Sequence, residues 1–202
     1  ALVLIGACGA PADDSGRIQP SASNTSYWQY RGETLVLLGG SDDDNLFQWP
    51  EPELIAQLDR LGQAGGNVVR NTISDRRDKG FEVYPYRQLP SGKYDLEQWN
   101  PEYLQRFERF LRETARRGIV VQIELWDRFD FTDYGEKQRW QVHPYNPQNN
   151  VNYSYWRSGF APAYYDHPGR NQQPFFFTTP EQDDNRLILG YQQRFIDKVL
   201  EH

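Results

Sequence analysis

The sequence predicts an α/β fold of about three strand–helix units. Three short apolar runs each break abruptly into polar residues: LVLLGGSDDDN from Leu35, NVVRN from Asn67 and IVVQIELWDR from Ile119. Continuous Val, Ile and Leu runs are typical of parallel strands that are buried on both faces. Segments with helical periodicity follow each run, and this order favours a parallel sheet with right-handed crossovers.

Proline, glycine and asparagine mark the ends of the expected elements. Pro50 and Pro52 suit the first turn of a helix that stops at Gly65, while Asn100 and Pro101 suit the cap and first turn of the next helix. In chain order, the expected elements are a strand at 33–39, a helix at 50–64, a strand at 67–70, a helix at 101–117, a strand at 119–125 and a helix from about residue 180.

Residues 128–179 form the longest connection between these elements. Loops beyond about 12 to 15 residues are usually functional or disordered, and the many aromatic residues of this one disfavour disorder. We therefore expect an ordered lid over the carboxyl ends of the strands.

Composition restricts the class of partner. The chain has 202 residues, a net charge of -6 and a pI near 5.1, which argues against nucleic acid or an anionic membrane surface as a partner. Its 6 Trp, 13 Tyr and 11 Phe residues suggest a stacking surface for a neutral ligand.

The first eight residues, ALVLIGAC, resemble the end of a bacterial lipoprotein signal, with the lipobox Ile5-Gly6-Ala7-Cys8. On this interpretation residues 1–8 are a truncated signal peptide, Cys8 is lipidated, residues 9–26 are a flexible tether, and residues 27–202 are an exported domain anchored to a bacterial envelope membrane. The absence of Met agrees with an incomplete amino end. The alternative is a short strand in which Cys8 is a small buried side chain.

Candidate binding residues follow the predicted strands, because the carboxyl ends of parallel strands build sites in α/β folds. They are Asp42, Asp43, Arg70, Asn71, Glu124, Trp126 and Asp127.

Each of these candidates also has a structural interpretation. Asp42 and Asp43 could bond ligand hydroxyls or form a solvated turn. A half-buried Arg70 needs a carboxylate partner, which is either part of a site or a structural ion pair. Strand alternation places Glu124 and Trp126 on one face. They either form a polar site in the barrel interior, or Glu124 fills the interior in a hydrogen-bonded layer and Trp126 caps the core.

Further candidates lie in the long loop, where aromatic faces and amides suit a sugar. These residues are Trp140, His143, Tyr145, Asn146 and Trp156. A metal site is not expected, because His143 and His167 lack acidic or Cys ligands at metal spacing. With a single Cys and no G-x-S-x-G motif, neither Cys nor Ser nucleophilic catalysis is supported, and no cofactor is expected.

The segment LDRLGQAGGNVVRN resembles the helix 1 to strand 2 region of clan A (β/α)8 glycoside hydrolases of the cellulase and mannanase type, in which an Arg ends the second strand. The segments LLGGSDDDNLFQWP, GKYDLEQWNPEYLQRFERFLRETARRGIVVQIELWDRFDF and YQQRFIDKVL are similar to secreted barrel hydrolases related to these enzymes. The resemblance covers residues 27–202 in order. Arg70 carries over by position, whereas Trp126 and Asp127 are assigned by location alone, since the third strand lacks the His common in cellulases.

The resemblance implies a partial TIM (β/α)8 barrel with about three βα units and a long third βα loop. It also implies hydrolysis of O-glycosidic bonds in a poly- or oligosaccharide by a retaining two-carboxylate mechanism. In this family the acid/base Glu ends strand 4 and the nucleophile Glu ends strand 7. Both are thus expected beyond His202, so we assign no catalytic residue and expect the 202-residue chain alone to be inactive.

Two alternatives remain open. One is a noncatalytic carbohydrate-binding or scaffolding lipoprotein that uses the aromatic loop as its stacking surface. The other is a complete small doubly wound domain, which would need covered sheet edges that three strands do not offer.

Overall fold

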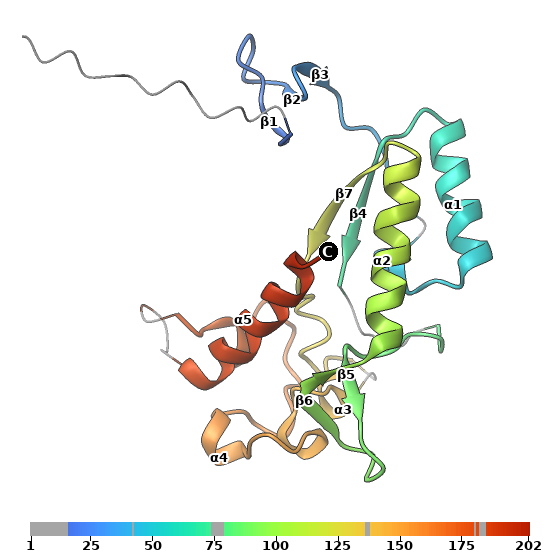
Figure 1. Ribbon diagram of the computed structural model, residues 1–202. Helices are drawn as coiled ribbons and strands as arrows, with labels where there is room; N and C mark the ends of the chain where they lie inside the picture. Colours follow the sequence, from blue (N-terminus) through green and yellow to red (C-terminus); the bar gives the residue numbers. More distant parts are fainter. Residues whose placement is uncertain (1–15, 42, 74–78, 136–137, 180, 182–184) are drawn as a thin grey trace, which may run out of the picture. The chain divides into compact units, whose positions relative to one another are not determined.

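The structure is a computed structural model that describes residues 16–41, 43–73, 79–135, 138–179, 181 and 185–202 (Figure 1). The chain divides into two compact units, Ala1–Leu38 and Gly39–His202. Cys8, the rest of the predicted signal peptide and Asp42 lie outside the described residues, so lipid attachment at Cys8 stays a prediction.

The first unit contains a small antiparallel sheet. Its strands, in spatial order, are β1 (Gln19–Pro20), β2 (Trp28–Tyr30) and β3 (Glu33–Leu35). The turn between β2 and β3 consists of Arg31 and Gly32, which both have positive φ angles, 51° and 81°. Such a two-residue turn matches the twist of a hairpin.

The predicted parallel strand at 33–39 is therefore wrong over most of its length. Its first half, β3, pairs antiparallel with β2, because the Arg31-Gly32 turn folds the chain back on itself. Only Gly39 joins the parallel sheet, through an isolated bridge to Val68. A side chain could not fit there, since a Cβ at Gly39 would lie 2.0 Å from the carbonyl oxygen of Val68.

The second unit holds a pair of parallel strands covered by helices. The elements that build this part are η1 (Leu46–Gln48), α1 (Glu51–Gln63), β4 (Val68–Thr72), α2 (Pro101–Arg116), β7 (Val120–Glu124) and α5 (Arg186–Leu200). The predicted strands at 67–70 and 119–125 and the first two predicted helices are confirmed within a few residues. The last helix begins later than expected, where the side chain of Asn185 caps it by accepting a hydrogen bond from the Ile188 amide.

Strands β4 and β7 pair in parallel with Arg70 opposite Gln122 and Thr72 opposite Glu124. The alternating residues on the other face, Val69 and Ile123 among them, pack against the helices. The second unit is thus a mixed α/β fold built on a parallel pair, and the described residues form no closed barrel.

A β-hairpin that the sequence analysis missed interrupts the crossover from β4 to β7. It consists of β5 (Tyr86–Gln88) and β6 (Tyr94–Trp99), which pair antiparallel. Gly92, with a φ angle of 82°, and the hydrogen bond from the Leu89 amide to the Lys93 carbonyl close its turn. The signal was present as a Pro-Ser-Gly turn before a segment of alternating polarity.

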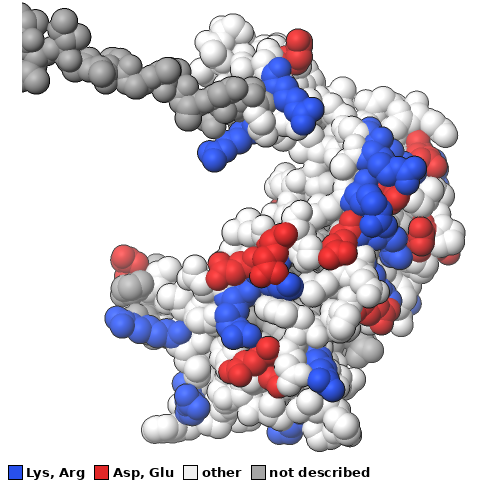
Figure 2. Space-filling view, viewed as in Figure 1, with Lys and Arg blue, Asp and Glu red and all other residues white. Residues whose placement is uncertain are grey.

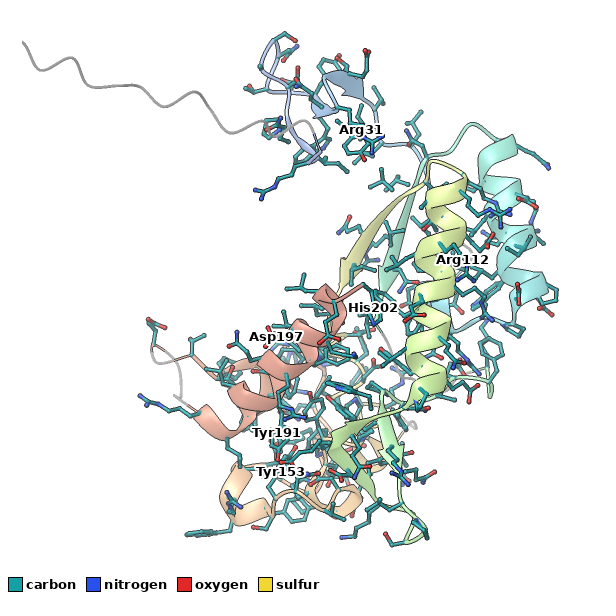
Figure 3. The ribbon with its side chains drawn as sticks, viewed as in Figure 1. Arg31, Arg112, Tyr153, Tyr191, Asp197 and His202 are labelled. Carbon is teal, nitrogen blue, oxygen red and sulfur yellow. The ribbon has the colours of Figure 1, made fainter. Side chains whose placement is uncertain are left out.

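The long connection after β7 is ordered, as expected. It contains four short helical segments: α3 (Arg139–Val142), η2 (Pro147–Asn149), α4 (Tyr155–Ser158) and η3 (Pro174–Phe176). In Figure 1 the arrowheads of β4 and β7 point toward these segments. The aromatic side chains of the loop form their own core, in which Tyr153 and Tyr191 of α5 have ring centroids 5.5 Å apart (Figure 3).

Two hydrophobic cores therefore stabilise the second unit, and two Trp residues connect them. The strand–helix core includes Leu54, Val69 and Phe110, all with 0% exposure. The loop core is built mainly from Tyr, Phe and Trp side chains. Trp99 and Trp126 pack against both cores, so the loop is fixed to the sheet by buried aromatic area rather than by hydrogen bonds alone.

The outer helices carry charges of both signs. Figure 2 shows basic and acidic side chains close together over α2 and α5. On α2, Glu113 accepts hydrogen bonds from Arg116 and Arg117. The end of α5 reaches α2, where His202 lies 3.4 Å from Glu108. Among the described residues, every helix is too short or too polar to cross a lipid bilayer.

We expect Asn100→Ala to lower the free energy of unfolding by about 1 to 2 kcal/mol. Its side chain accepts a hydrogen bond from the Glu102 amide at the start of α2 and donates one to the Tyr84 carbonyl. Urea denaturation measures the loss. Gln105→Ala, an exposed position on the same helix, is the control and should change stability by less than about 0.5 kcal/mol. Equal stability of the two variants would contradict the capping role.

Candidate functional site

A pocket lies at the carboxyl ends of β4 and β7, and we call it the strand-end pocket. Its volume is about 430 Å³, within the range of small-molecule sites. Eleven residues line it: Asp44, Arg70, Thr72, Glu124, Trp126, Asp127, Arg128, Phe129, His167, Pro168 and Gly169. Residues 167–169 belong to the long loop, so the expectation that this loop covers the strand ends is confirmed.

The polar floor of this pocket is a bidentate ion pair between Arg70 and Glu124. The Nε and Nη2 groups of Arg70 donate to Oε1 and Oε2 of Glu124, each over 2.6 Å. Thr72 Oγ1 donates a further hydrogen bond of 3.0 Å to Glu124 Oε2. The pairing register produces this arrangement, because Arg70 and Thr72 alternate onto the same face of β4 and Glu124 lies opposite Thr72.

The carboxylate partner that we expected for Arg70 is thus found. Arg70 itself, which we expected to be half-buried, is largely exposed. The Arg70 side chain is 61% exposed and that of Glu124 is 32% exposed. The face that carries them opens into the pocket, whereas the opposite face of β4 is sealed by the helices.

The ion pair fixes the charge of Glu124. The hydrogen bond from Arg70 lowers the pKa of Glu124 below its ordinary value, with a smaller opposing effect of burial, and Glu124 in turn raises the pKa of Arg70. A carboxylate with a lowered pKa stays ionised at neutral pH, so Glu124 suits a positioning or electrostatic role better than that of a general acid.

One wall of the pocket is aromatic. Trp126 is half-buried and packs edge-on against Phe175, with ring centroids 5.4 Å apart. Phe129 is 39% exposed, and its ring lies edge-on to that of His167 at 5.8 Å. Asp127 lies between these aromatic residues in the chain and accepts a hydrogen bond from the Phe129 amide. The pocket therefore offers carboxylate acceptors, an Arg donor and exposed ring atoms together.

Two of the predicted strand-end residues do not line the pocket. Asn71 has 0% exposure, because it points to the opposite face of β4, where its side chain accepts from the Phe47 amide and donates to the Thr72 carbonyl. Asp43 faces Trp49 and Lys79 instead. Burial alone would raise the pKa of Asp43, but hydrogen bonds with Asp44 and Trp49 and the charge of Lys79 together lower it. Both residues hold loops in place.

Four predicted residues of the long loop are buried inside it, which leaves no ring face or amide open to a sugar. Trp140, His143, Tyr145 and Asn146 are at most 5% exposed. The Trp140 indole donates to the Ala161 carbonyl, and Asn146 donates to the carbonyls of Trp140 and Pro162. The prediction that these four residues contact a ligand is therefore wrong, and their role is structural. Burying large aromatic side chains is favourable, so they fill the interior of the loop instead of its surface.

Trp156 has the opposite surroundings. Its side chain is 92% exposed on α4, and it does not line the strand-end pocket. Of the twelve predicted binding residues, the structure thus brings together Arg70, Glu124, Trp126 and Asp127.

Sequence reasoning missed several residues of the pocket. Asp44 and Thr72 come from the predicted strand ends, and Phe129 directly follows one of them. His167, Pro168 and Gly169 are distant in sequence, and their only signal was a His-Pro-Gly turn inside an aromatic loop. Among the described residues, no group of His, Cys, Asp and Glu side chains is arranged to hold a metal ion.

Comparisons with known proteins give one distant structural similarity. No family model and no curated protein matches the chain. Among solved structures, it can be superposed on a protein of Bacteroides vulgatus ATCC 8482 described as a "putative glycoside hydrolase", with a TM-score of 0.45 and 20% sequence identity. The superposition covers 65% of this chain and 27% of that protein, so the chain spans about a quarter of its length.

The buried His143 gives a pH prediction. Burial lowers the pKa of His143 from 6.5 to about 3. Between these values the unfolded chain binds a proton that the folded chain does not, so stability must fall as the pH drops, by about 1.4 kcal/mol per pH unit from this group. His143→Asn keeps an acceptor for the Tyr145 amide, which donates to His143 Nδ1, but cannot titrate.

Urea denaturation between pH 7.5 and pH 4.5 tests this. The stability difference between the original protein and His143→Asn should shrink steadily as the pH falls. Gln105→Ala, an exposed position whose side chain does not titrate, serves as the control and should keep the slope of the original protein. Parallel stability curves for the original protein and His143→Asn would contradict the prediction.

Proposed function

We propose that this chain forms the amino-terminal part of a (β/α)8 glycoside hydrolase that cleaves O-glycosidic bonds in a neutral poly- or oligosaccharide. The observation that carries the proposal is the strand-end pocket, which combines an Arg70–Glu124 pair with Asp127 and the rings of Trp126 and Phe129. Carboxylates accept hydrogen bonds from hydroxyl groups, and ring faces suit the C–H faces of a pyranose.

The position of the pocket supports the same conclusion. In barrel enzymes the site lies where the parallel strands end and the βα loops begin. Here Arg70 and Glu124 project from neighbouring parallel strands, and Trp126 and Asp127 follow β7 directly. The helices cover the opposite face of the pair, so a ligand can approach these residues only from the side of the loop and the open face.

Charge narrows the substrate class. The lining holds three carboxylates, Asp44, Glu124 and Asp127, against two guanidinium groups, Arg70 and Arg128, so negative charge is in excess by one. An anionic sugar would be repelled by these carboxylates, and a neutral sugar would not. A neutral substrate therefore fits the lining best.

In the proposed retaining mechanism, one carboxyl group acts as acid/base and a second, about 5 to 5.5 Å away, as nucleophile. We assign both to residues that follow His202. The role of Arg70 is to position charge: two of its five N–H donors bond Glu124, and the others remain for a substrate hydroxyl or the nucleophile. Glu124 stays ionised and holds the guanidinium plane in orientation.

The proposal predicts that Arg70→Lys weakens the binding of a neutral oligosaccharide by about tenfold, because Lys cannot form the bidentate pair that orients Glu124. Isothermal titration with cellohexaose and mannohexaose measures the dissociation constant. Arg60→Lys, an exposed position on α1, is the matched control and should bind like the original protein. Unchanged affinity in Arg70→Lys would count against the site.

Hydrolysis itself is tested on the full-length protein. Release of reducing ends from a panel of neutral polysaccharides should be measurable, and NMR of the first products should show the retained anomeric configuration. Inverted products would contradict the retaining mechanism, and binding without any turnover would favour a noncatalytic carbohydrate-binding protein.

A further inference from the structure

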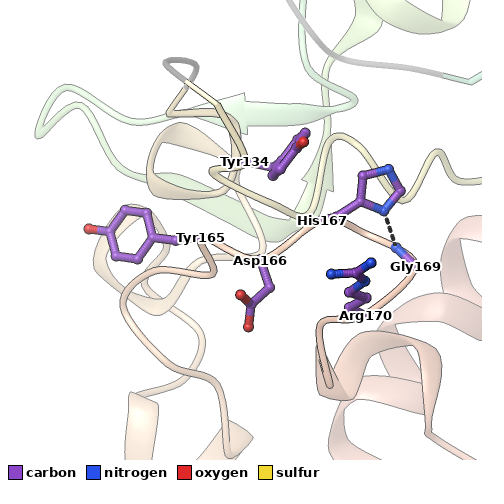
Figure 4. A pocket seen from close by; sticks show the side chains of 6 residues that line it. All are labelled: Tyr134, Tyr165, Asp166, His167, Gly169 and Arg170. Carbon is purple, nitrogen blue, oxygen red and sulfur yellow. Dashed lines mark hydrogen bonds between the residues drawn. The ribbon is translucent and has the colours of Figure 1, made fainter.

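A second hollow adjoins the strand-end pocket, and we call it the loop hollow. Its volume is about 510 Å³, and its six lining residues all come from the long loop: Tyr134, Tyr165, Asp166, His167, Gly169 and Arg170 (Figure 4). His167 and Gly169 line both hollows. The two spaces are therefore neighbours that share one wall.

The loop hollow exposes aromatic rings and charged side chains to solvent. Tyr134 is 49% exposed and Tyr165 is 70% exposed. Figure 4 shows both rings at the hollow, with the side chains of Asp166 and Arg170 below them in this view. Within the part of the chain that the structure describes, neither charge forms an ion pair. The hollow thus presents a hydrogen-bond acceptor and a donor beside two exposed rings.

Two buried polar residues, Thr132 and Asp133, hold the backbone beneath these exposed residues through hydrogen bonds. Thr132 and Asp133 are only 1% and 2% exposed. The one hydroxyl hydrogen of Thr132 is shared between the carbonyls of Tyr164 and Asp166, each 2.9 Å from Oγ1, and Oγ1 accepts from the Tyr134 amide. Asp133 accepts from the amide of Tyr164. The segments that carry Tyr134 and Tyr165 are therefore fixed to each other by buried hydrogen bonds, which reduces the entropy that binding would cost.

The shared wall is fixed as well. The Gly169 amide donates to His167 Nδ1 over 3.1 Å, and the amides of Arg170 and Asn171 donate to the His167 carbonyl. The His167 ring lies edge-on to Phe129 of the strand-end pocket at 5.8 Å and to Tyr134 of the loop hollow at 5.1 Å. The ring is thus held between an aromatic residue of each hollow.

We propose that the loop hollow is a second sugar subsite, and that the ligand is a neutral oligosaccharide long enough to pass over His167 and occupy both hollows. This inference rests on the proposed function. It adds a minimum length for the oligosaccharide and the residues that select for that length. Tyr134 and Tyr165 stack on sugar rings, while Asp166 and Arg170 bond hydroxyl groups. Because the second subsite belongs to the long loop, a sugar too short to reach it loses those contacts and binds weakly.

Isothermal titration with cello- and manno-oligosaccharides of one to six units tests the inference on the original protein and on Tyr165→Ala. The affinity of the original protein should increase with length until both hollows are filled. Tyr165→Ala should weaken binding of the long sugars roughly three- to tenfold and leave the shortest bound sugar unaffected. Tyr27→Ala removes a comparably exposed tyrosine that lines neither hollow and should bind like the original protein.

The outcomes separate this inference from the proposed function. Binding that depends on Arg70 but neither on length nor on Tyr165 would overturn the second subsite and leave the proposed function standing. Absence of binding for every sugar would overturn both. Tighter binding of an oligogalacturonate than of the neutral series would show that Arg170 recognises an anionic sugar and would overturn the neutral assignment. Arg170→Gln provides a second variant on an exposed side chain, and it should weaken only the long neutral sugars.

Discussion

The parallel register of β4 and β7 is the constraint on which the rest of the site depends. Pairing Arg70 with Gln122 and Thr72 with Glu124 sends Arg70, Thr72 and Glu124 to one face. The same register sends Val69 and Ile123 to the other face, where the helices cover them. A shift of β4 by one residue would turn Arg70 toward the apolar core and separate it from Glu124, at a cost of several kcal/mol for the unpaired buried charge. Burial of the apolar face therefore determines where the polar face opens.

The long loop is fixed to this sheet by aromatic packing. Trp126 and Trp99 contact both hydrophobic cores, and buried residues such as Trp140 and Asn146 hold the irregular backbone through hydrogen bonds to its carbonyl groups. Because the interior of the loop is densely packed and hydrogen-bonded, its backbone can support exposed side chains at the surface. The strand-end pocket and the loop hollow are consequences of the same arrangement, in which buried rings support exposed ones.

Much of the central fold could be predicted from sequence, because hydrophobic periodicity and capping residues are local signals. The Asn100 cap and the two parallel strands are of this kind, whereas the carboxylate partner of Arg70 followed from the cost of an unpaired Arg. The antiparallel β3 belongs to a sheet whose strands are too short for a clear pattern, whereas the hairpin of β5 and β6 had a turn signal, Pro-Ser-Gly, that the sequence analysis missed. The loop was harder still: Trp140 and Trp156 look alike in sequence, yet one is 0% and the other 92% exposed, because only the tertiary packing of the loop distinguishes them.

The central claim is that a neutral oligosaccharide binds beside Trp126 at the ends of β4 and β7, and NMR of the indole groups tests it most directly. The chain has six Trp residues, so six indole N–H signals can be assigned by single Trp→Phe variants. Titration with cellohexaose or mannohexaose should shift the Trp126 signal in a saturable way and leave that of the buried Trp140 in place. Saturable binding that leaves Trp126 unchanged and shifts only Trp156 would contradict the account, because it would locate the sugar on α4 instead.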